Sequence, residues 1–285
     1  MRKLNFTLLT LAFLFIATNL LAQTSGSYRF TYEFVFQKDT NDVHSKTKEL
    51  YFLDVFKDHS SFVGANKLRM DKVMDSMSRV FESRFGSNGG MAVNMMRTNA
   101  RSTGYVIYKF PDGAVEYQSA IGGVLYAYKE DMNLDWDISD SSATYSNYNC
   151  QTATTTYGGR KWKAWFTMDI PVQNGPYKFM GLPGLIVKIE DDKNQCLFEL
   201  TEVGTIDITE SPIPKAEKIN KANLVKMTEN ALSKPISAMM GSLPAGANIN
   251  MANIRDQNGN PISLEDIEKR RQEALRKNNN RIELN

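Results

Sequence analysis

Aromatic and polar side chains alternate with a period of two between residues 27 and 36. The aromatic positions are Tyr28, Phe30, Tyr32, Phe34 and Phe36. Successive side chains of a strand point to opposite sides of its sheet, so this alternation is typical of a strand that buries one face. A second segment of similar character at 49–56 predicts a further strand.

The apolar period changes to 3.6 between residues 66 and 84, which predicts a helix. Its apolar positions are Met70, Val73, Met74, Met77, Val80 and Phe81. We expect this helix to be an insertion in a chain that otherwise reads as strands.

Strand character returns seven more times, separated by short polar or glycine-containing turns such as Pro111-Asp112-Gly113 and Gly158-Gly159. The predicted strands are 104–110, 115–119, 123–129, 146–156, 161–170, 185–190 and 196–203. Short connections join antiparallel neighbours, whereas parallel strands need long crossovers. We therefore predict a mainly β fold, a curved antiparallel sheet or open barrel of about nine strands, with one inserted helix and C-terminal helices.

The composition changes after residue 208, which divides the chain into a predicted β-rich domain at 23–208 and a helical and loop extension at 209–285. A helix is expected at about 215–232. A second helix follows Ser263, which can cap it with Asp266 three residues later. We expect the apolar stripe of this last helix to dock on the sheet.

The first 22 residues have the features of a secretory signal peptide. Arg2 and Lys3 precede an apolar stretch that ends at Ala22, and no cysteine follows at the predicted cleavage site. We expect an exported protein located in the periplasm, at the outer-membrane surface or outside the cell. No later stretch is long and apolar enough to predict a transmembrane segment in the mature chain.

The net charge of the mature chain bears on whether nucleic acid is an expected partner. The chain has 34 Lys and Arg against 32 Asp and Glu, and residues 1–22 contain two of the basic residues and no acidic one. The mature chain thus has 34 − 2 = 32 basic against 32 acidic residues. A balanced chain has no long-range field to attract polyanions, so nucleic-acid binding is not expected.

Cys150 and Cys196 are the only cysteines, and each lies on a predicted strand. In an exported protein this favours a disulfide between them. The alternative is two separate buried thiols that pack as small hydrophobic side chains.

No catalytic or metal-binding motif is apparent. The two histidines, His44 and His59, have neither metal-ligand spacing nor a nearby serine-nucleophile motif, and surface positions are expected for both. Carboxylates are plentiful, but their spacing along the chain pairs none of them for hydrolysis. We expect no catalytic residue, no cofactor and no metal.

The most specific sequence pattern runs from Gly158 to Ile186. It contains Gly-Arg at a turn, an Ala-Trp pair, Ile170-Pro171, Gly175-Pro176 and the hexapeptide Gly181-Leu182-Pro183-Gly184-Leu185-Ile186. This pattern resembles the GLPGLI family of exported bacterial proteins over nearly all of the mature chain. The resemblance implies no established activity. The chain is also distantly similar to the N-terminal domain of some secreted peptide N-glycosidases, without a counterpart of their catalytic module.

Pro183 and Gly184 suit the central positions of a type II turn, and Gly181 permits an unusual dihedral before it. One interpretation is a structural corner that starts the next strand. The other is that several tight corners frame a ligand site. Arg160 is expected to pair with a carboxylate of the sheet rather than with a ligand.

The leading hypothesis is an exported, non-enzymatic β-rich domain that binds an envelope protein, a peptide or a glycan on the concave side of its sheet. The candidate binding residues are Arg160, Trp165, Pro176, Tyr177 and Pro183. Strand parity places Trp162 in the core and Trp165 on the opposite face. The alternatives are a hydrolase that acts on an envelope polymer through acidic residues and a structural subunit of an outer-membrane assembly.

Overall fold

The computed structural model describes residues 27–85, 104–121, 123–208, 211–233 and 263–284, and the predicted signal peptide lies outside these residues. The strands are β1 Ser27–Gln37, β2 Lys46–Val55, β3 Ser60–Gly64, β4 Tyr105–Lys109, β5 Ala114–Ile121, β6 Val124–Asp131, β7 Asp137–Tyr145, β8 Tyr148–Tyr157, β9 Arg160–Thr167, β10 Leu185–Asp191, β11 Cys196–Ile206 and β12 Glu217–Lys218. The helices are α2 Ala65–Phe85, α4 Lys221–Ser233 and α6 Leu264–Arg276.

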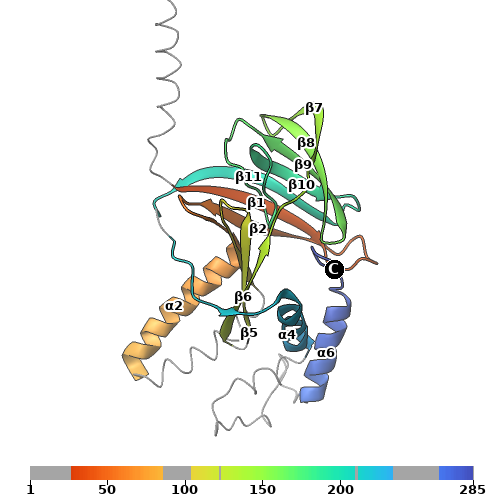
Figure 1. Cartoon of the computed structure of the whole chain (residues 1–285). Coiled ribbons are helices and arrows are strands. Elements are labelled where there is room, and N and C mark those ends of the chain that lie inside the picture. The colour runs from red at the N-terminus through yellow and green to blue at the C-terminus, as the bar shows by residue number, and fades with distance from the viewer. Residues whose placement is uncertain (1–26, 86–103, 122, 209–210, 234–262, 285) are drawn as a thin grey trace, which may run out of the picture.

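All twelve strands belong to one sheet, in the order β12-β6-β5-β4-β3-β2-β1-β11-β10-β9-β8-β7. Neighbours are antiparallel except β12 and β6. The sheet is open and curved, with β7–β10 at one end and β5–β6 at the other (Figure 1). The predicted curved antiparallel sheet is therefore confirmed.

The strand count differs from the predicted nine because β3, β7 and β12 were not expected. β3 has five residues and follows β2 after a short turn, beyond the end of the strand predicted at 49–56. β7 is polar and exposed at nearly every position because it lies at the edge of the sheet, where no apolar alternation is required. β12 has only two residues.

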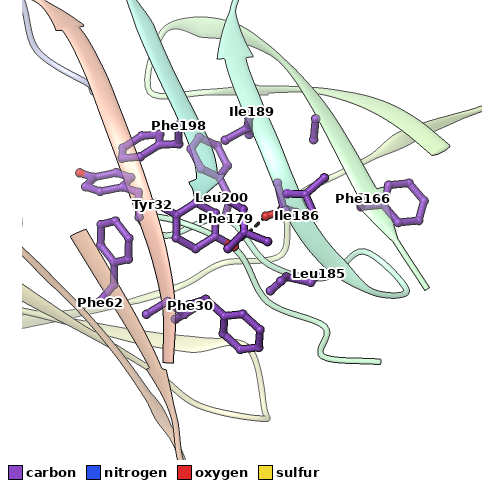
Figure 2. Packing of buried hydrophobic residues seen from close by; sticks show 14 of the residues in the cluster. Phe30, Tyr32, Phe62, Phe166, Phe179, Leu185, Ile186, Ile189, Phe198 and Leu200 are labelled. Carbon is purple, nitrogen blue, oxygen red and sulfur yellow. Dashed lines mark hydrogen bonds between the residues drawn. The ribbon is translucent and has the colours of Figure 1, made fainter. Parts of the chain in front are cut away.

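The inner face of the curved sheet carries the core. The aromatic positions of β1 point inward. Phe30 and Tyr32 lie opposite core residues of β2, and Tyr32 and Phe34 lie opposite core residues of β11. Figure 2 shows side chains from β1, β3, β10 and β11 converging on the same space. Within it, the buried Tyr32 hydroxyl donates a hydrogen bond of 2.7 Å to the carbonyl oxygen of Ile186.

The connection between β9 and β10, residues 168–184, also fills this inner face. Tyr177, Phe179 and Leu182 are buried there, with Phe179 fully enclosed. The centroid of its ring lies 4.8 Å from that of Trp162, which is 1% exposed, as strand parity predicted. A loop therefore supplies part of the hydrophobic core.

α2 and α4 lie close to the predicted helices, with differences in exposure and in one boundary. α2 confirms the predicted helix, but Figure 1 shows it projecting from the sheet, and Met70, Val73 and Val80 are exposed. α4 begins at Lys221 instead of about 215 because residues 217–218 pair with β6. No helix among the residues that the structure describes is long and apolar enough to cross a membrane.

Ser263 caps α6 as expected, since its hydroxyl accepts a hydrogen bond from the backbone N–H of Asp266. α6 packs against α4 rather than docking on the sheet through its own stripe. Residues after α6 make the sheet contact instead. The division of the chain at residue 208 stays a prediction.

The corner at residues 181–184 is not the predicted type II turn. Gly184 has a φ of +159°, which is almost extended, and its N–H bonds to the carbonyl of Leu182. Gly181 has the left-handed φ, +94°. Gly184 is required for another reason: a Cβ there would lie 2.1 Å from the carbonyl oxygen of Thr167.

The disulfide expected between Cys150 and Cys196 is not formed, and both are buried free thiols. β9 and β10 lie between β8, which carries Cys150, and β11, which carries Cys196. Three inter-strand spacings amount to about 14 Å, whereas the Cα atoms of a disulfide lie within about 7 Å of each other.

The state of the cysteines is testable. Burial raises the pKa of Cys150, and it raises the pKa of Cys196 to about 12. Both thiols should resist iodoacetamide in the native protein, and both should react after denaturation without reductant. Mass spectrometry counts the added groups, and a denatured chain that takes up none would establish a disulfide.

Gly184→Ala should destabilise the fold by about 3 kcal/mol, because the strand backbone of β9 must move to admit one methyl group. Gly204→Ala is the matched control, since a Cβ there meets nothing within 4 Å. Thermal unfolding compares the two variants. Equal melting temperatures would contradict the close approach at Gly184.

Candidate functional site

Lys178 is a fully buried cation that joins the two ends of the sheet. Its side chain is 0% exposed. Nζ donates to the Tyr128 hydroxyl of β6 at 2.9 Å and forms an ion pair with Glu130 of the same strand. It also donates to Glu283 Oε1 at 2.6 Å.

Four tyrosine rings surround this ammonium group. The centroids of Tyr117, Tyr128, Tyr157 and Tyr177 lie 5.5, 5.1, 5.9 and 5.4 Å from Nζ. The negative faces of aromatic rings attract a desolvated cation, so the cage offsets part of the cost of burying Lys178. Tyr157 belongs to β8, and eight strands separate β8 from β6 in the sheet order.

Glu283 completes the cage from far along the sequence. Its Oε1 accepts hydrogen bonds from Tyr157 at 2.9 Å and Tyr177 at 2.5 Å, and its carboxylate also pairs with Lys221 of α4. Burial alone would raise the pKa of Glu283, but Lys178, Lys221 and Tyr177 outweigh it and lower the pKa to about 2. Glu283 is therefore ionised at neutral pH.

Arg160 holds the same terminal segment at the other side. Its guanidinium pairs with Asp191 at 2.6 Å and donates to Gln195, and both charged side chains are at most 1% exposed. The remaining donors bind Asn280 and the carbonyl oxygens of Arg281 and Ile282. We call residues 280–284 the terminal segment.

The turn between β8 and β9 contacts the terminal segment through its backbone. Gly158 and Gly159 have φ of +59° and +75°, as the favoured two-residue hairpin turn requires. The N–H of Leu284 donates to the Gly158 carbonyl at 2.7 Å. A Cβ on Gly158 would lie 3.0 Å from Cα of Glu283, so glycine also permits the segment to approach.

A second buried lysine holds the β9–β10 connection. Lys109 of β4 is 2% exposed and donates to the Gly175 carbonyl at 2.5 Å. Burial lowers the pKa of Lys109 well below its usual value. The side-chain amide of Asn174 donates a hydrogen bond of 2.8 Å to the Ser60 hydroxyl. The connection is therefore fixed to β3 and β4 just ahead of Lys178 in the sequence.

The structure separates the five binding residues predicted from the sequence. Arg160 and Tyr177 contact the terminal segment, and the expected pairing of Arg160 with a sheet carboxylate is confirmed by Asp191. Pro176 is buried, and Pro183 is exposed at the corner. Trp165 lies half-buried on the outer face.

The sequence reasoning did not find Lys178 or Glu283. Neither has a motif around it, although Lys178 lies between two aromatic residues. The expectation for the histidines was correct for His44, which is exposed. It was wrong for His59, whose ring is buried and bonded through Nδ1 to Asp58 at 2.8 Å.

A cavity of about 870 Å³ opens beside β7–β10. Most of its lining residues are polar or charged, and both signs of charge are present. The lining residues are Asn133, Leu134, Asp135, Asp137, Thr154, Thr155, Thr156, Lys161, Trp162, Lys163, Glu190, Asp191, Asp192 and Asn194. Among the described residues, no group of His, Cys, Asp and Glu side chains is arranged to hold a metal ion.

Trp165 lies next to this cavity on the outer face. Lys163, which lines the cavity, places Nζ 4.9 Å from the centroid of the Trp165 ring, and Lys188 places its own at 4.6 Å. Lys188 also pairs with Glu190 at 3.1 Å. The outer face here thus presents an aromatic ring among charged groups.

Acid should weaken the fold through Glu283. The pKa of this carboxylate is lower in the folded chain, about 2, than its ordinary value of 4.5, so its stabilisation is complete above about pH 4.5 and is lost as the pH falls towards 2. A shift of this size corresponds to about 3 kcal/mol. Denaturant unfolding at pH 7, 4.5 and 2.5 measures it.

Glu283→Gln should remove this part of the pH dependence, and Glu265→Gln on the exposed side of α6 should leave it unchanged. If wild type and Glu283→Gln lost stability in parallel below pH 4.5, the ionised pair would not be the cause.

Residues 158–188 match a family described as a protein of unknown function (Porph_ging). The matched stretch runs from the β8–β9 turn through β9 and the connection that carries Lys178 into β10. It contains the hexapeptide on which the sequence resemblance depends, and the family name given by that resemblance is not confirmed. Comparison with curated proteins finds no match.

The solved structures to which this chain shows some similarity include two of PNGF-II and one of a lipoprotein-sorting domain. PNGF-II in space group P21 aligns with a TM-score of 0.49 and 12% identity, over 73% of this chain and 34% of that chain. PNGF-II in space group C2 gives 0.49 and 12%, over 81% and 37%. A putative outer membrane lipoprotein-sorting protein domain from Vibrio parahaemolyticus gives 0.28 and 8%, over 75% and 97%.

This chain thus spans about a third of the length of the PNGF-II chains that it matches. At these TM-scores the likenesses support no assignment of activity or partner. What the comparisons establish is a segment, residues 158–188, that is similar to a family of unknown function.

Proposed function

We propose that this protein is an exported, envelope-associated β-rich domain that binds a peptide or a glycan at the cavity beside β7–β10. The exported location follows from the features of residues 1–22. The sequence placed the binding role on the concave face, whereas the cavity is lined by residues from both faces of its strands, including the exposed Lys163 and the buried Trp162. The observation that carries the proposal is this open cavity, most of whose lining residues are polar or charged.

The concave face has little room for a partner because the chain fills it. Tyr177, Phe179 and Leu182 are buried against the sheet, and the terminal segment occupies the site between Arg160 and Lys178. A partner on this face would have to displace part of the chain itself.

The cavity has the size and lining of a binding site for a polar ligand. Its volume of about 870 Å³ lies within the usual range for small-molecule sites. Thr154, Lys163 and Glu190 lie in one row across three strands. Donors and acceptors therefore recur about every 4.8 Å across the floor, a spacing that suits successive polar groups of a peptide or a sugar.

Two of the acids that line the cavity lie too far apart to form a glycosidase pair. Asp137 and Glu190 line the cavity in the same cross-strand row, with Thr154 and Lys163 between them. Three strand spacings separate them by about 14 Å. A glycosidase pair needs about 5–10 Å, so these two acids do not form one.

The proposal is tested with the full mature chain on peptide and glycan arrays. A positive ligand should lose at least tenfold in affinity with Lys163→Ala and with Trp165→Ala, and it should bind Lys48→Ala normally. Lys48 is the control because it is exposed on the same sheet, where it pairs with Glu33 on β1, away from the cavity. Binding that is indifferent to Lys163 and Trp165 would place the site elsewhere.

The two tryptophans should also differ in their effect on the fold. Trp162→Ala removes a ring packed on Phe179 and should cost about 4 kcal/mol. Trp165→Ala, at a half-buried outer position, should cost about 1 kcal/mol. Equal losses in thermal unfolding would make Trp165 part of the scaffold.

A further inference from the structure

The terminal segment lies in its site as a bound peptide would. It pairs with no strand of the sheet and is held by side chains and single backbone bonds. Figure 1 shows this end of the chain close to the β8–β9 end of the sheet, beyond α6. Many of its contacts belong to residues more than a hundred positions earlier, including Gly158, Arg160 and Lys178.

The receiving side of this site is organised without the segment. Asp191 and Gln195 orient the guanidinium of Arg160, and Glu130 and Tyr128 orient the ammonium of Lys178. Each cation therefore keeps one carboxylate partner of its own. Arg160 directs its other donors, and Lys178 its remaining bond, to the terminal segment.

The bonds define what the site recognises. Arg160 donates hydrogen bonds to the Asn280 amide oxygen and to two successive carbonyl oxygens. Asn280 itself donates to the carbonyl oxygens of Gln37 and Lys38. Three residues later, the Glu283 carboxylate enters the tyrosine cage.

The two intervening positions make fewer specific contacts with the site. The side chain of Arg281 makes an exposed ion pair with Glu229 at 2.7 Å and is 55% exposed, whereas Ile282 packs partly against the core. The recognised pattern is therefore asparagine, any residue, an apolar residue and glutamate.

We propose that the groove between Arg160 and Lys178 is a receptor for extended peptides of this pattern, and that residues 280–284 are its ligand in cis. The terminal segment of a second copy of this chain, which carries the same pattern, occupies the groove in trans when the receiving chain's own segment leaves. The cavity beside β7–β10 adjoins this site through Asp191, which lines the cavity and pairs with Arg160.

The test uses a labelled, C-terminally amidated peptide with the sequence of residues 278–284 and the full mature chain. Asn280→Ala and Glu283→Ala weaken the chain's own segment and leave the groove intact. Fluorescence anisotropy should show these variants binding the peptide at least tenfold more tightly than wild type, whose tethered segment competes at a millimolar effective concentration.

Peptide variants test the recognised pattern. Replacing the glutamate by glutamine should weaken binding at least tenfold, because the neutral amide loses its attraction to Lys178. Replacing the arginine by alanine should have little effect. Equal binding of the glutamine peptide would overturn the assignment of the cage as the carboxylate site.

The source of the peptide is distinguished by mixing two variants. Glu283→Ala offers an emptied groove, and Gly158→Ala blocks its own groove while leaving its segment free. A mixed dimer in light scattering identifies a second copy as donor. Monomers that still bind the free peptide would overturn a second copy as the donor.

An experiment on wild type tests the proposal without depending on the folding of any variant. Millimolar peptide should speed hydrogen exchange at the Leu284 amide, which is bonded to Gly158 in the closed state. The proposal would be overturned by unchanged exchange in wild type. It would also be overturned if folded variants with a released segment bound no peptide, and the segment would then have a purely structural role.

Discussion

The pairing of Lys178 with Glu283 holds the two ends of the open sheet together. A curved sheet whose outer strands do not pair with each other leaves its inner face accessible at the gap. Here the gap is closed by one buried cation that contacts β6 on one side and, through Glu283, β8 on the other. Burying such a charge is costly unless its partners are complete, and four tyrosines and two carboxylates complete them.

The need to place Lys178 beside Glu283 explains local features of the β9–β10 connection. Gly175 must approach Ile186 closely, since a Cβ there would lie 2.7 Å from its side chain, and Gly184 must approach Thr167. Lys109 and Asn174 fasten the same stretch to the sheet. The glycines of the hexapeptide region therefore serve close packing of a loop that delivers Lys178, more than the geometry of a turn.

Sequence patterning predicted the parts of the fold that depend on nearest neighbours. Alternation placed the Phe30 and Trp162 side chains inward, and the cap at Ser263 followed from two residues. It missed β7, because a polar edge strand has no buried face to create a pattern. It also missed the caged lysine, since Lys178 and Glu283 are 105 positions apart and only the curvature of the sheet brings them together.

The distribution of charge explains why the outer cavity, rather than the inner face, suits an incoming partner. Arg160, Asp191 and Lys178 are desolvated, and each already has its opposite charge within the chain. Lys163 and Asp137 are exposed at the cavity and remain hydrated. A ligand there exchanges water for hydrogen bonds with little desolvation left to overcome, whereas a ligand on the inner face must first replace an ionic contact that the fold itself uses. A peptide supplied in trans can therefore enter the inner groove only by exchange with the terminal segment, whereas a ligand at the cavity displaces water alone.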